Sequence, residues 1–577
     1  MKKIYLILLG IIVICIGAYF YLRFRVLKAK DFKPEVSKAR SVTDLRPAII
    51  AKLQQMVKDG SDGLYYLSVE KVEPHVLTSS FDMANASIIP DSQAIRKLDS
   101  AQKLPDDLFK ISFSKLHITG LVINDFLSTD HLSLNQVSIT DPVIEVYHKK
   151  RAYNERQREM HANSTLYQRI MKTMRSIVVN KIELINGTFI NHDLTKKKSA
   201  NIIREIAIHL KDVRIDSSTQ YDQKRFLFAK KAHIVTTNFS SRTPDSLYMI
   251  KCGSIDIAVP GNDITVLNFE IRPRLNKEQF EKHLTAREEM YDVKIPNFTL
   301  NNISWWELTN NESVLAKSAE INSPTLNVFL DRSLPFRKVK PNTFPHQALM
   351  KIPIPVSVAD INIHHGSVTY SEYNPGMEKT GTIYLDEING KATNFTNIPS
   401  QIRLHPLFTV KINALFMRNI PMNTTFNFDL AKYKTGNFKM DFDIGKMDSS
   451  NLNKFIGPLG EFMIKKGTLQ KGVAHIEGDN FKTSGKGELL YRDLYVVGLK
   501  KDHDKPNNIK KKSITSFLGN VLLVKNNNPS KNKPPRMVDL TFDRDSKTTF
   551  LSFVWKTMLT GILETVGLPK SFANKPY

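Results

Sequence analysis

The stretch FNFDLAKYKTGNFKMDFDI, residues 426–444, indicates the fold class of this chain. Its first part places apolar side chains at every second position, in Phe426, Phe428 and Leu430. After a turn at residues 434–437 the alternation resumes, in Phe438, Met440, Phe442 and Ile444. A period of two residues is typical of a β-strand with one apolar face and one polar face. The stretch therefore predicts two paired strands, and it raises the question of what covers their apolar face.

The same alternation recurs in a longer unit. VNKIELINGTFI from Val179 and VADINIHHGSVTY from Val358 share an apolar residue, an Ile three positions later, an apolar residue two further on, and then a glycine. FSKLHITGLVI from Phe113 and IPNFTLNNISWW from Ile295 are looser copies, and alternating segments follow each copy. The glycine is expected to serve a turn or bulge. The pattern predicts a repeated antiparallel meander.

Composition and the amino terminus suggest a membrane setting. The chain has 577 residues and a formal net charge of +25, which favours anionic partners. Residues 4–22 are nineteen uncharged residues, close to the roughly 20 that cross a bilayer. The run ends in large residues, unlike a cleavage site, so we expect an uncleaved signal anchor. Lysine and arginine flank both ends and give no orientation. The two cysteines, Cys15 and Cys252, imply no disulfide framework.

Few helices are expected beyond this anchor. Apolar spacing and capping residues predict short helices at Pro47–Lys58, Ser164–Arg175 and Asp448–Ile456. These are too few to cover a large sheet, whose apolar face must pack against something. A second sheet would make an ordinary sandwich, and an elongated, curled sheet filled by a ligand is the other solution. The sequence leaves both open.

Several phrases resemble the AsmA-like family of Gram-negative envelopes. KISFSKLHITGLVIND and LSLNQVSITDPVIEVYH, with Asp141 and Pro142, resemble the family's opening, and residues 459–496 resemble its carboxy-terminal module. PDSLYMI and INIHHGSVTYSEY look like the variant typical of Bacteroidota-type envelopes. The resemblance implies an inner-membrane anchored, periplasmic β-groove, related to TamB and the bridge-like lipid transfer proteins, that handles phospholipid. It also implies a role in outer-membrane biogenesis or lipid homeostasis.

We therefore expect a mainly β chain built as a curled antiparallel sheet, a β-groove. The expected divisions are an anchor (1–30), a membrane-proximal helix with first strands (31–110), a repeated groove (111–400) with a helical insert near 151–176, a carboxy-terminal module (401–499), a basic loop (500–538), and a last strand and helix (539–577). The candidate groove residues are Leu116, Ile118, Leu132, Leu134, Ile182, Leu184, Phe298, Leu300, Ile361, Ile363, Ile383, Leu385, Phe426, Phe428, Leu430, Phe438, Met440, Phe442 and Ile444.

The end of the chain has a helical pattern of its own. TFLSFVWKTMLTGILETVG places Leu551, Val554, Met558, Ile562 and Thr565 near one helical face. We expect this helix to cap the groove or lie in a membrane interface. The candidate residues for that role are Phe550, Phe553, Trp555, Met558 and Ile562.

Catalytic and metal motifs are weak in this sequence. His364 and His365 are adjacent on a strand and point to opposite faces, so they make a poor metal pair. Gly485-Lys486-Gly487 lacks the rest of a phosphate-binding loop, and no nucleophile elbow or HExxH is present. Trp305 and Trp306 are expected on a strand, one facing each side. We expect no enzyme activity, no cofactor and no metal.

The function expected from these features is lipid binding or conduction. The partners are membrane lipids through their acyl chains and possible envelope or outer-membrane assembly proteins, without nucleic acid. The alternative is a non-catalytic envelope scaffold that holds no lipid and recruits assembly machinery. Co-purified phospholipid separates the two.

Overall fold

A computed structural model describes the chain at residues 46–61, 63–120, 131–154, 176–194, 201–243, 245–311, 313–335, 343–459, 462–501, 509–512, 524–544 and 548–568. The apolar run at 4–22, Cys15 and the helix expected at 164–175 lie outside these residues. None of the described helices combines the length and apolarity needed to cross a membrane.

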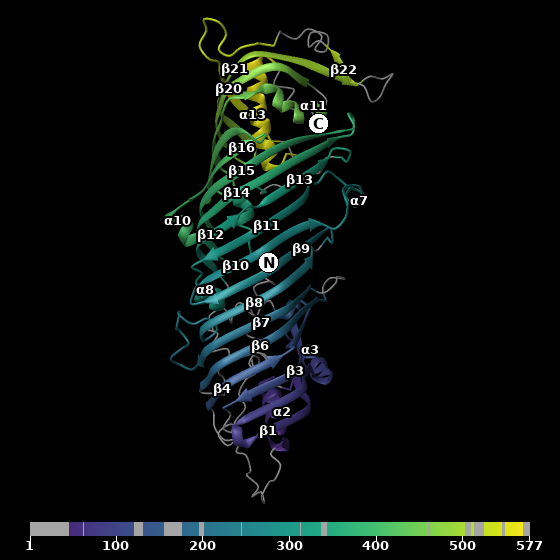
Figure 1. Ribbon diagram of the computed structural model, residues 1–577, viewed down its shortest axis with the longest axis vertical. Helices are drawn as coiled ribbons and strands as arrows, with labels where there is room; N and C mark the ends of the chain where they lie inside the picture. Colours follow the sequence, from purple (N-terminus) through teal and green to yellow (C-terminus); the bar gives the residue numbers. More distant parts are fainter. Residues whose placement is uncertain are drawn as a thin grey trace, which may run out of the picture. The chain divides into compact units, whose positions relative to one another are not determined.

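The described chain is mainly β, as the alternation predicts (Figure 1). The strands are β1 (Tyr65–His75), β2 (Ser80–Pro90), β3 (Asp107–Thr119), β4 (His131–Thr140), β5 (Val143–His148), β6 (Ser176–Asp193), β7 (Asn201–Ile215), β8 (Ala229–Arg242), β9 (Tyr248–Val259), β10 (Asp263–Pro273), β11 (Met290–Asn301), β12 (Val314–Asn322), β13 (Thr325–Asp331), β14 (Val356–Asn374), β15 (Lys379–Thr396), β16 (Leu407–Phe416), β17 (Ile420–Asp429), β18 (Phe438–Ile444), β19 (Met447–Asp448), β20 (Phe462–Gly478), β21 (Lys482–Lys501), β22 (Ile509–Lys512) and β23 (Met537–Asp543).

Short helices lie between these strands. They are α2 (Arg46–Gly60), η1 (Val76–Thr78), α3 (Ser92–Ser100), α7 (Lys277–Glu281), α8 (Trp305–Asn310), α9 (Pro345–Leu349), α10 (Pro399–Leu404), η2 (Ser449–Leu452), α11 (Asn453–Leu459) and α13 (Phe550–Val566). The helices expected at 47–58 and 448–456 are confirmed by α2 and by η2 with α11. Asp448 caps η2 by accepting a hydrogen bond from the backbone N–H of Ser450, as its position suggests.

The chain separates into two compact units. The first comprises residues 1–244, 250–267 and 301–315, and the second residues 245–249, 268–300 and 316–577. In the first unit β1, β2 and β3 pair antiparallel, β3 pairs with both β4 and β5, and β6, β7 and β8 follow antiparallel. In the second unit β14 to β18, β20, β21 and β23 form one antiparallel series.

The sheet is mixed, which corrects the expectation of an antiparallel sheet at three strand pairs. β4 and β5 both lie parallel to β6, and β13 lies parallel to β14. Each parallel step follows a long connection, residues 149–175 before β6 and residues 332–355 before β14. A parallel pair requires such a crossover, whereas neighbouring antiparallel strands need only a tight turn. The alternation in the sequence carries no information on this choice.

Residues with left-handed backbone conformation keep the apolar side chains of a long strand on one face. The buried side chains of β7 are Ile203, Ile206, Ile208, Leu210, Val213 and Ile215. Strict alternation would put the first of these and the last two on the face opposite the middle three. Glu205 (φ 54°) and Asp212 (φ 53°) lie at the two phase changes, and the register with β8 shifts on both sides of Arg204, the residue before Glu205. Near Glu205 the phase change is a bulge against β8, whereas at Asp212 the register with β6 and β8 is unbroken and the neighbouring strands change phase together. In both places the apolar side chains return to the same face.

These phase changes explain the repeated spacing in the sequence. In β6, the three-residue interval from Val179 to Ile182 lies opposite the left-handed Asp212 of β7. In β14, the interval from Val358 to Ile361 lies opposite the left-handed Asn394 of β15. The step to the glycine passes through Asn186 (φ 56°) or His365 (φ 51°). The predicted bulge is therefore present, but its left-handed residue precedes the glycine.

The glycine itself allows close packing. A side chain at Gly187 would overlap Leu184, and one at Gly366 would press against Pro324 and Ile388. Asp141 (φ 50°) and Pro142 separate β4 from β5, and Ser323 (φ 49°) and Pro324 separate β12 from β13. In each case two short strands follow one another in the place of one long strand.

The tryptophan pair corrects another expectation. Trp305 and Trp306 begin helix α8 and do not alternate across a strand. Trp305 is buried, donates from Nε1 to Oδ1 of Asn262 at 2.7 Å, and meets the ring of Phe226 edge-on. Ser304 caps the helix by accepting from the N–H of Glu307, which favours a helical turn here. Trp305 is therefore a core residue of the first unit.

Candidate functional site

The candidate site is the apolar face of the strands, which can be followed within each unit from strand to strand by register. In the first unit, a row of directly neighbouring residues runs through Val72, Met83, Leu116, Ile139, Leu184, Ile208 and Ile234. Candidates Ile118 and Ile182 lie in the row beside it, and Leu132 and Leu134 pair with buried residues of β6. Six of the sequence-predicted residues therefore share one face of this unit.

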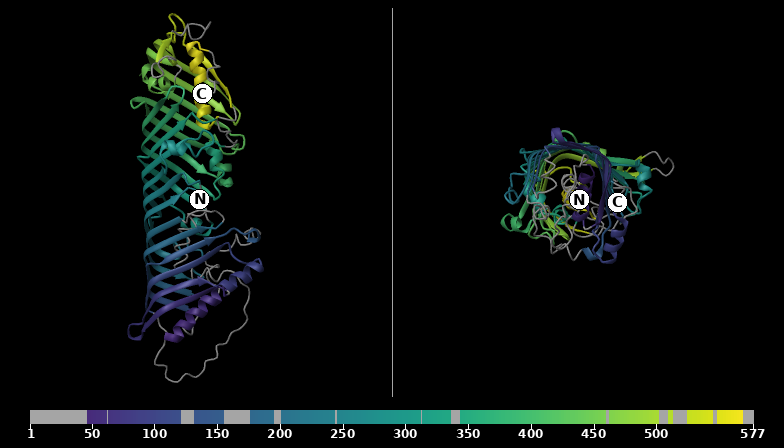
Figure 2. Two further views of the ribbon diagram at one scale, coloured as in Figure 1. Left: turned by 90° about the vertical axis from the view of Figure 1, so that its right-hand side faces the viewer. Right: turned by 90° about the horizontal axis from the view of Figure 1, so that it is seen from below.

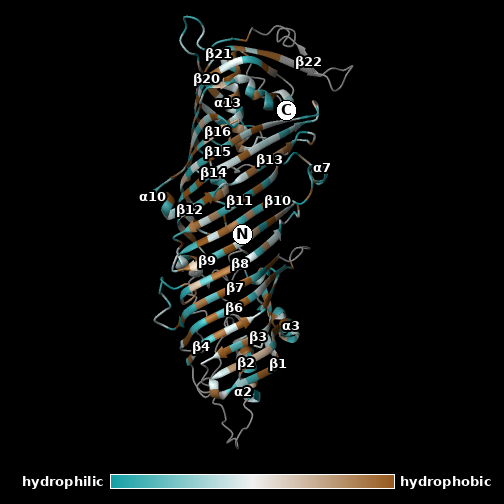
Figure 3. Cartoon of the chain, viewed as in Figure 1, coloured by the Kyte–Doolittle hydropathy of each residue, from teal (hydrophilic) through white to brown (hydrophobic). Residues whose placement is uncertain are grey.

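The second unit has two such rows. One runs through Ile361, Ala392, Val410, Phe426, Met440, Ile476, Gly485 and Leu540. The other runs through Val293, Leu326, Val368, Leu385, Phe416 and Ile420. Most of the remaining predicted residues flank these rows, and Phe298 and Leu300 are half-buried residues of β11. Figure 3 shows the alternation of apolar and polar residues along the strands.

The opposite side chains of the same strands are polar and often form ion pairs across neighbouring strands. Lys439 contacts Glu477 at 2.6 Å, and His475 contacts Asp441 at 2.7 Å. In the first unit, hydrogen bonds from Lys181 and His209 lower the pKa of Glu183 against the effect of burial. His364 and His365 contact Glu320 and Glu387, respectively, and belong to this pattern. The two faces of the strands therefore differ sharply in chemistry.

At one end of the second unit, protein covers the apolar face. Helix α13, the yellow helix in Figure 2, lies along β21 and β23. Its Phe550 ring lies 5.1 Å from Phe438 and 5.7 Å from Phe428. Phe344, next to α9, packs 4.9 Å from Phe550. Of the apolar side chains in residues 426–444, Phe428, Leu430, Phe438 and Met440 are therefore buried in this cluster, and Phe426 and Phe442 are half-buried against it.

The buried side of α13 differs from the one that helical spacing suggested. Phe553, Val554, Thr557 and Gly561 are buried, whereas Leu551 is 73% exposed and Trp555 is 40% exposed. A side chain at Gly561 would overlap Leu540 of β23, and the hydroxyls of Thr557 and Thr483 lie 2.7 Å apart. Close approach at a small residue, together with a buried hydroxyl pair, sets which side faces the sheet. Met558 and Ile562 are half-buried.

Farther along the same face, the cover is incomplete. Ile361, Ile363, Ile383 and Leu385 are all half-buried. The partial cover includes α11, whose Phe455 ring lies 6.3 Å from Tyr370. These side chains provide apolar surface that water still reaches.

A charged group within this face was not expected from the sequence. Glu372 follows Tyr370 on β14, accepts a hydrogen bond from its hydroxyl, and pairs with Arg332 at 3.2 Å. Burial raises the pKa of Glu372, and Arg332 opposes that shift. Val368, Tyr370 and Glu372 are spaced two residues apart, so strand periodicity alone places Glu372 on the same face as Val368 and Tyr370. Among the described residues, no group of three or more metal-ligating side chains is assembled.

Comparisons with known proteins give little help. No family model matches the chain, and no curated protein matches it. A crystal structure of the sex pheromone staph-cAM373 precursor aligns with 8% identity over 62% of this chain and 96% of that one, with a TM-score of 0.11. That likeness is too low to indicate a shared fold.

Proposed function

We propose that the apolar face binds the acyl chains of membrane phospholipids. In this proposal, residues 4–22 anchor the chain in an inner membrane and the sheet serves outer-membrane lipid homeostasis from the periplasm. The observation that carries the proposal is the series of left-handed residues, which keeps one face apolar where strict alternation would bring polar side chains onto it. A sheet whose apolar side chains formed only a core at its centre would not need left-handed residues to keep one face apolar along several long strands.

The magnitude of acyl-chain burial supports a role for such a face. Exposing an acyl chain to water costs about 0.8 kcal/mol per methylene, or roughly 12 kcal/mol for sixteen carbons. Contact with half-buried residues such as Ile383 and Leu385 removes part of that cost, and it also covers their own apolar surface. No catalytic group is needed for this function.

The scaffold alternative is favoured by one region. The cluster formed by α13, Phe344 and the rings of β17 and β18 is closed by protein alone, as in a dry core. If the whole face were sealed in this way, the chain would hold no lipid. The half-buried residues of β14 and β15 therefore decide between the two functions.

The test places a photoreactive benzophenone amino acid at Leu385 in the full chain, with Lys391 as the matched position. Both residues lie on β15, but Lys391 is exposed and pairs with Asp360 on the polar face. Irradiation in lipid-containing membranes is expected to attach phospholipid at residue 385 and not at residue 391, detected by mass spectrometry. Equal labelling at both positions, or no lipid at residue 385, would contradict the proposal.

A further inference from the structure

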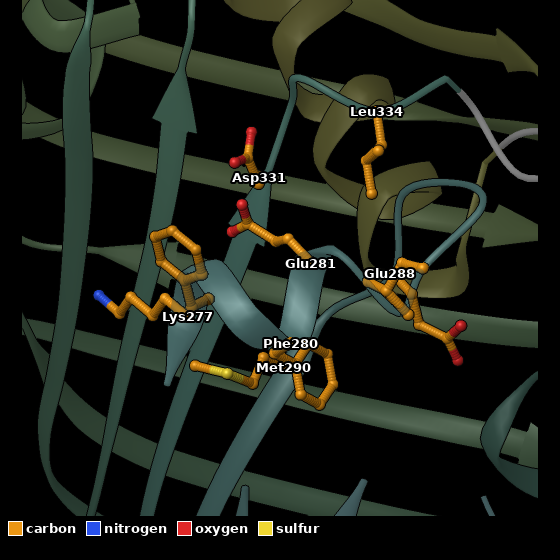
Figure 4. A pocket seen from close by; sticks show the side chains of 9 residues that line it. Lys277, Phe280, Glu281, Glu288, Met290, Asp331 and Leu334 are labelled. Carbon is orange, nitrogen blue, oxygen red and sulfur yellow. The ribbon is translucent and has the colours of Figure 1, made fainter. Parts of the chain in front are cut away.

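The pocket between α7, the start of β11 and the end of β13 is already served by the protein itself (Figure 4). Lys277 places its ammonium group 4.1 Å from the centre of the Phe329 ring. The carboxyl groups of Glu281 and Asp331 point toward one another. The groups of this pocket therefore partner one another, and the most exposed apolar side chains of the second unit lie elsewhere.

One edge of the second unit carries a group of exposed apolar side chains. Leu404 ends helix α10, Leu407 begins β16, and Phe481 lies in the turn between β20 and β21. These side chains are 75%, 49% and 73% exposed, respectively. Figure 1 shows α10 at the left-hand edge of the sheet. Exposed apolar residues that are grouped, unlike single ones, mark interaction sites.

Hydrogen bonds join the segments of this edge into one surface. Leu430, at the end of β17, donates its backbone N–H to the carbonyl of Pro406 at 2.8 Å. Asn480 donates its backbone N–H to the carbonyl of Thr435 at 2.9 Å. We call this surface the basic rim, and it comprises residues 399–407, 429–437 and 479–482.

The exposed side chains of the basic rim are held in place from behind. The side-chain amide of Asn394 donates to the carbonyl of Leu407 at 2.9 Å. Asp479 accepts a hydrogen bond from the backbone N–H of Phe481 at 2.7 Å, which fixes the turn. A surface that is ordered before binding loses little conformational entropy when it meets a partner.

The exposed charges of the basic rim have one sign. They belong to Arg403, Lys432, Lys434 and Lys482. Asp429 and Asp479 are half-buried and accept backbone N–H bonds within the rim, and Asp429 also lies 3.8 Å from Lys432. Asp543 of β23 lies opposite Lys482 and is exposed. Positive charge therefore remains in excess on this edge, which favours an anionic partner.

We propose that the basic rim docks on the surface of a bilayer that contains anionic phospholipid. Leu404, Leu407 and Phe481 enter the interface, and the cationic side chains lie among the phosphate groups. Exposed apolar side chains beside lysine and arginine are the combination that binds such a surface.

A membrane is favoured over a protein partner by the composition of the basic rim. Three of its four exposed cations are lysines, and lysine is depleted at protein–protein interfaces. Lysine also suits a membrane surface, because its long apolar stem can lie along the interface while its ammonium group stays in water. This docking surface does not rest on acyl-chain binding by β14 and β15.

The first experiment reports on single residues of the full chain. A fluorophore that shifts to the blue in apolar surroundings is attached at Phe481→Cys or, as the matched position, at Met537→Cys. Both variants carry Cys15→Ser, and Cys252 is buried. Met537 is 59% exposed and begins β23, whose other end pairs with residue 482 of the rim. We expect a blue shift at residue 481 with phosphatidylglycerol vesicles and none at residue 537.

The second experiment tests the charges with two triple variants. The rim variant combines Lys432→Gln, Lys434→Gln and Lys482→Gln. The control combines Lys411→Gln, Lys446→Gln and Lys471→Gln, which replace exposed lysines of the same unit outside the rim. Each lysine beside an anionic leaflet strengthens binding about fivefold, so the rim variant should weaken docking at residue 481 about a hundredfold. The control lowers the net charge equally and should change docking little.

The outcomes decide the proposal without a folding ambiguity, because all six lysines are exposed and melting temperatures should stay unchanged. An absent shift at residue 481, an equal shift at residue 537, or an equal shift with phosphatidylcholine vesicles would overturn it. Equal weakening by the two triple variants would also overturn it, since overall charge would then explain binding. Lipid labelling at residue 385 is measured separately, so failure of this surface and failure of acyl-chain binding are distinguishable.

Discussion

The second unit covers one apolar face in two different ways. Across β16, β17 and β18, the side chains of Phe408, Phe428 and Met440 are buried beneath α13 and Phe344. Across β14 and β15, the residues of this face named above, Ile361, Ile363, Ile383 and Leu385, are half-buried. The strands have the same period in both regions, so the difference lies in which distant segment packs on them. A sealed end and a partly open region on one face are consistent with a cap beside a binding surface.

The largest effect is expected at the sealed end. Phe553→Asp places a carboxylate at a fully buried position, and it should destabilise the unit by about 4 kcal/mol or more. Leu551→Asp lies on the same helix but is exposed, so its effect should stay within about 0.5 kcal/mol. Urea denaturation measures both changes. Similar costs for the two variants would show that α13 does not seal the face as described.

A pH effect of intermediate size is expected beside this helix. His346 is fully buried, stacks on Phe428 at 5.1 Å, and neither of its ring nitrogens has a hydrogen-bond partner among the described residues. Burial lowers the pKa of His346 to about 4, against a weak opposing effect of Asp429. Because the folded pKa lies below the unfolded value of 6.5, the native state keeps its full stability above pH 6.5 and loses it as pH falls toward 4.

The measurement compares wild type with His346→Leu in urea at several pH values. The stability lost between pH 6.5 and 4 should be smaller in the variant by on the order of 2 to 3 kcal/mol. The same loss in both proteins would mean that other groups cause the acid sensitivity.

A smaller effect is expected where the cap approaches the sheet most closely. Gly561→Ala introduces a methyl group that overlaps Leu540, and it should cost about 1 to 3 kcal/mol although alanine favours helices. Adding Leu540→Ala should recover part of that cost if the two residues are in contact. Strictly additive costs in the double variant would place α13 farther from β23.

The smallest effect on stability, paired with a loss of lipid, is expected in the partly open region. Ile383→Asp should destabilise the unit less than Phe428→Asp, because Ile383 is half-buried and Phe428 is buried. Only Ile383→Asp should also reduce co-purified phospholipid while the protein stays folded. Unchanged lipid content in that variant would favour the scaffold alternative.

Much of the fold follows from local pattern. The alternation in residues 426–444, the glycine-containing repeat and the caps near Asp448 predicted strands and short helices that the structure contains. Trp305 and Trp306 differ from the prediction because two adjacent aromatic residues suit either a strand or the start of a helix, and the Ser304 cap favours the helix. The charged contact between Arg332 and Glu372 joins residues 40 apart, so it depends on strand register.

The sequence by itself determined that this protein is mainly β and which side chains of each strand are apolar, because both depend only on spacing along the chain. Tertiary structure decided that left-handed residues bring those side chains to one face, that α13 buries Phe553 and exposes Leu551, and that two steps of the sheet are parallel. Each of these depends on contacts between residues far apart in sequence, whose free energies no local pattern records.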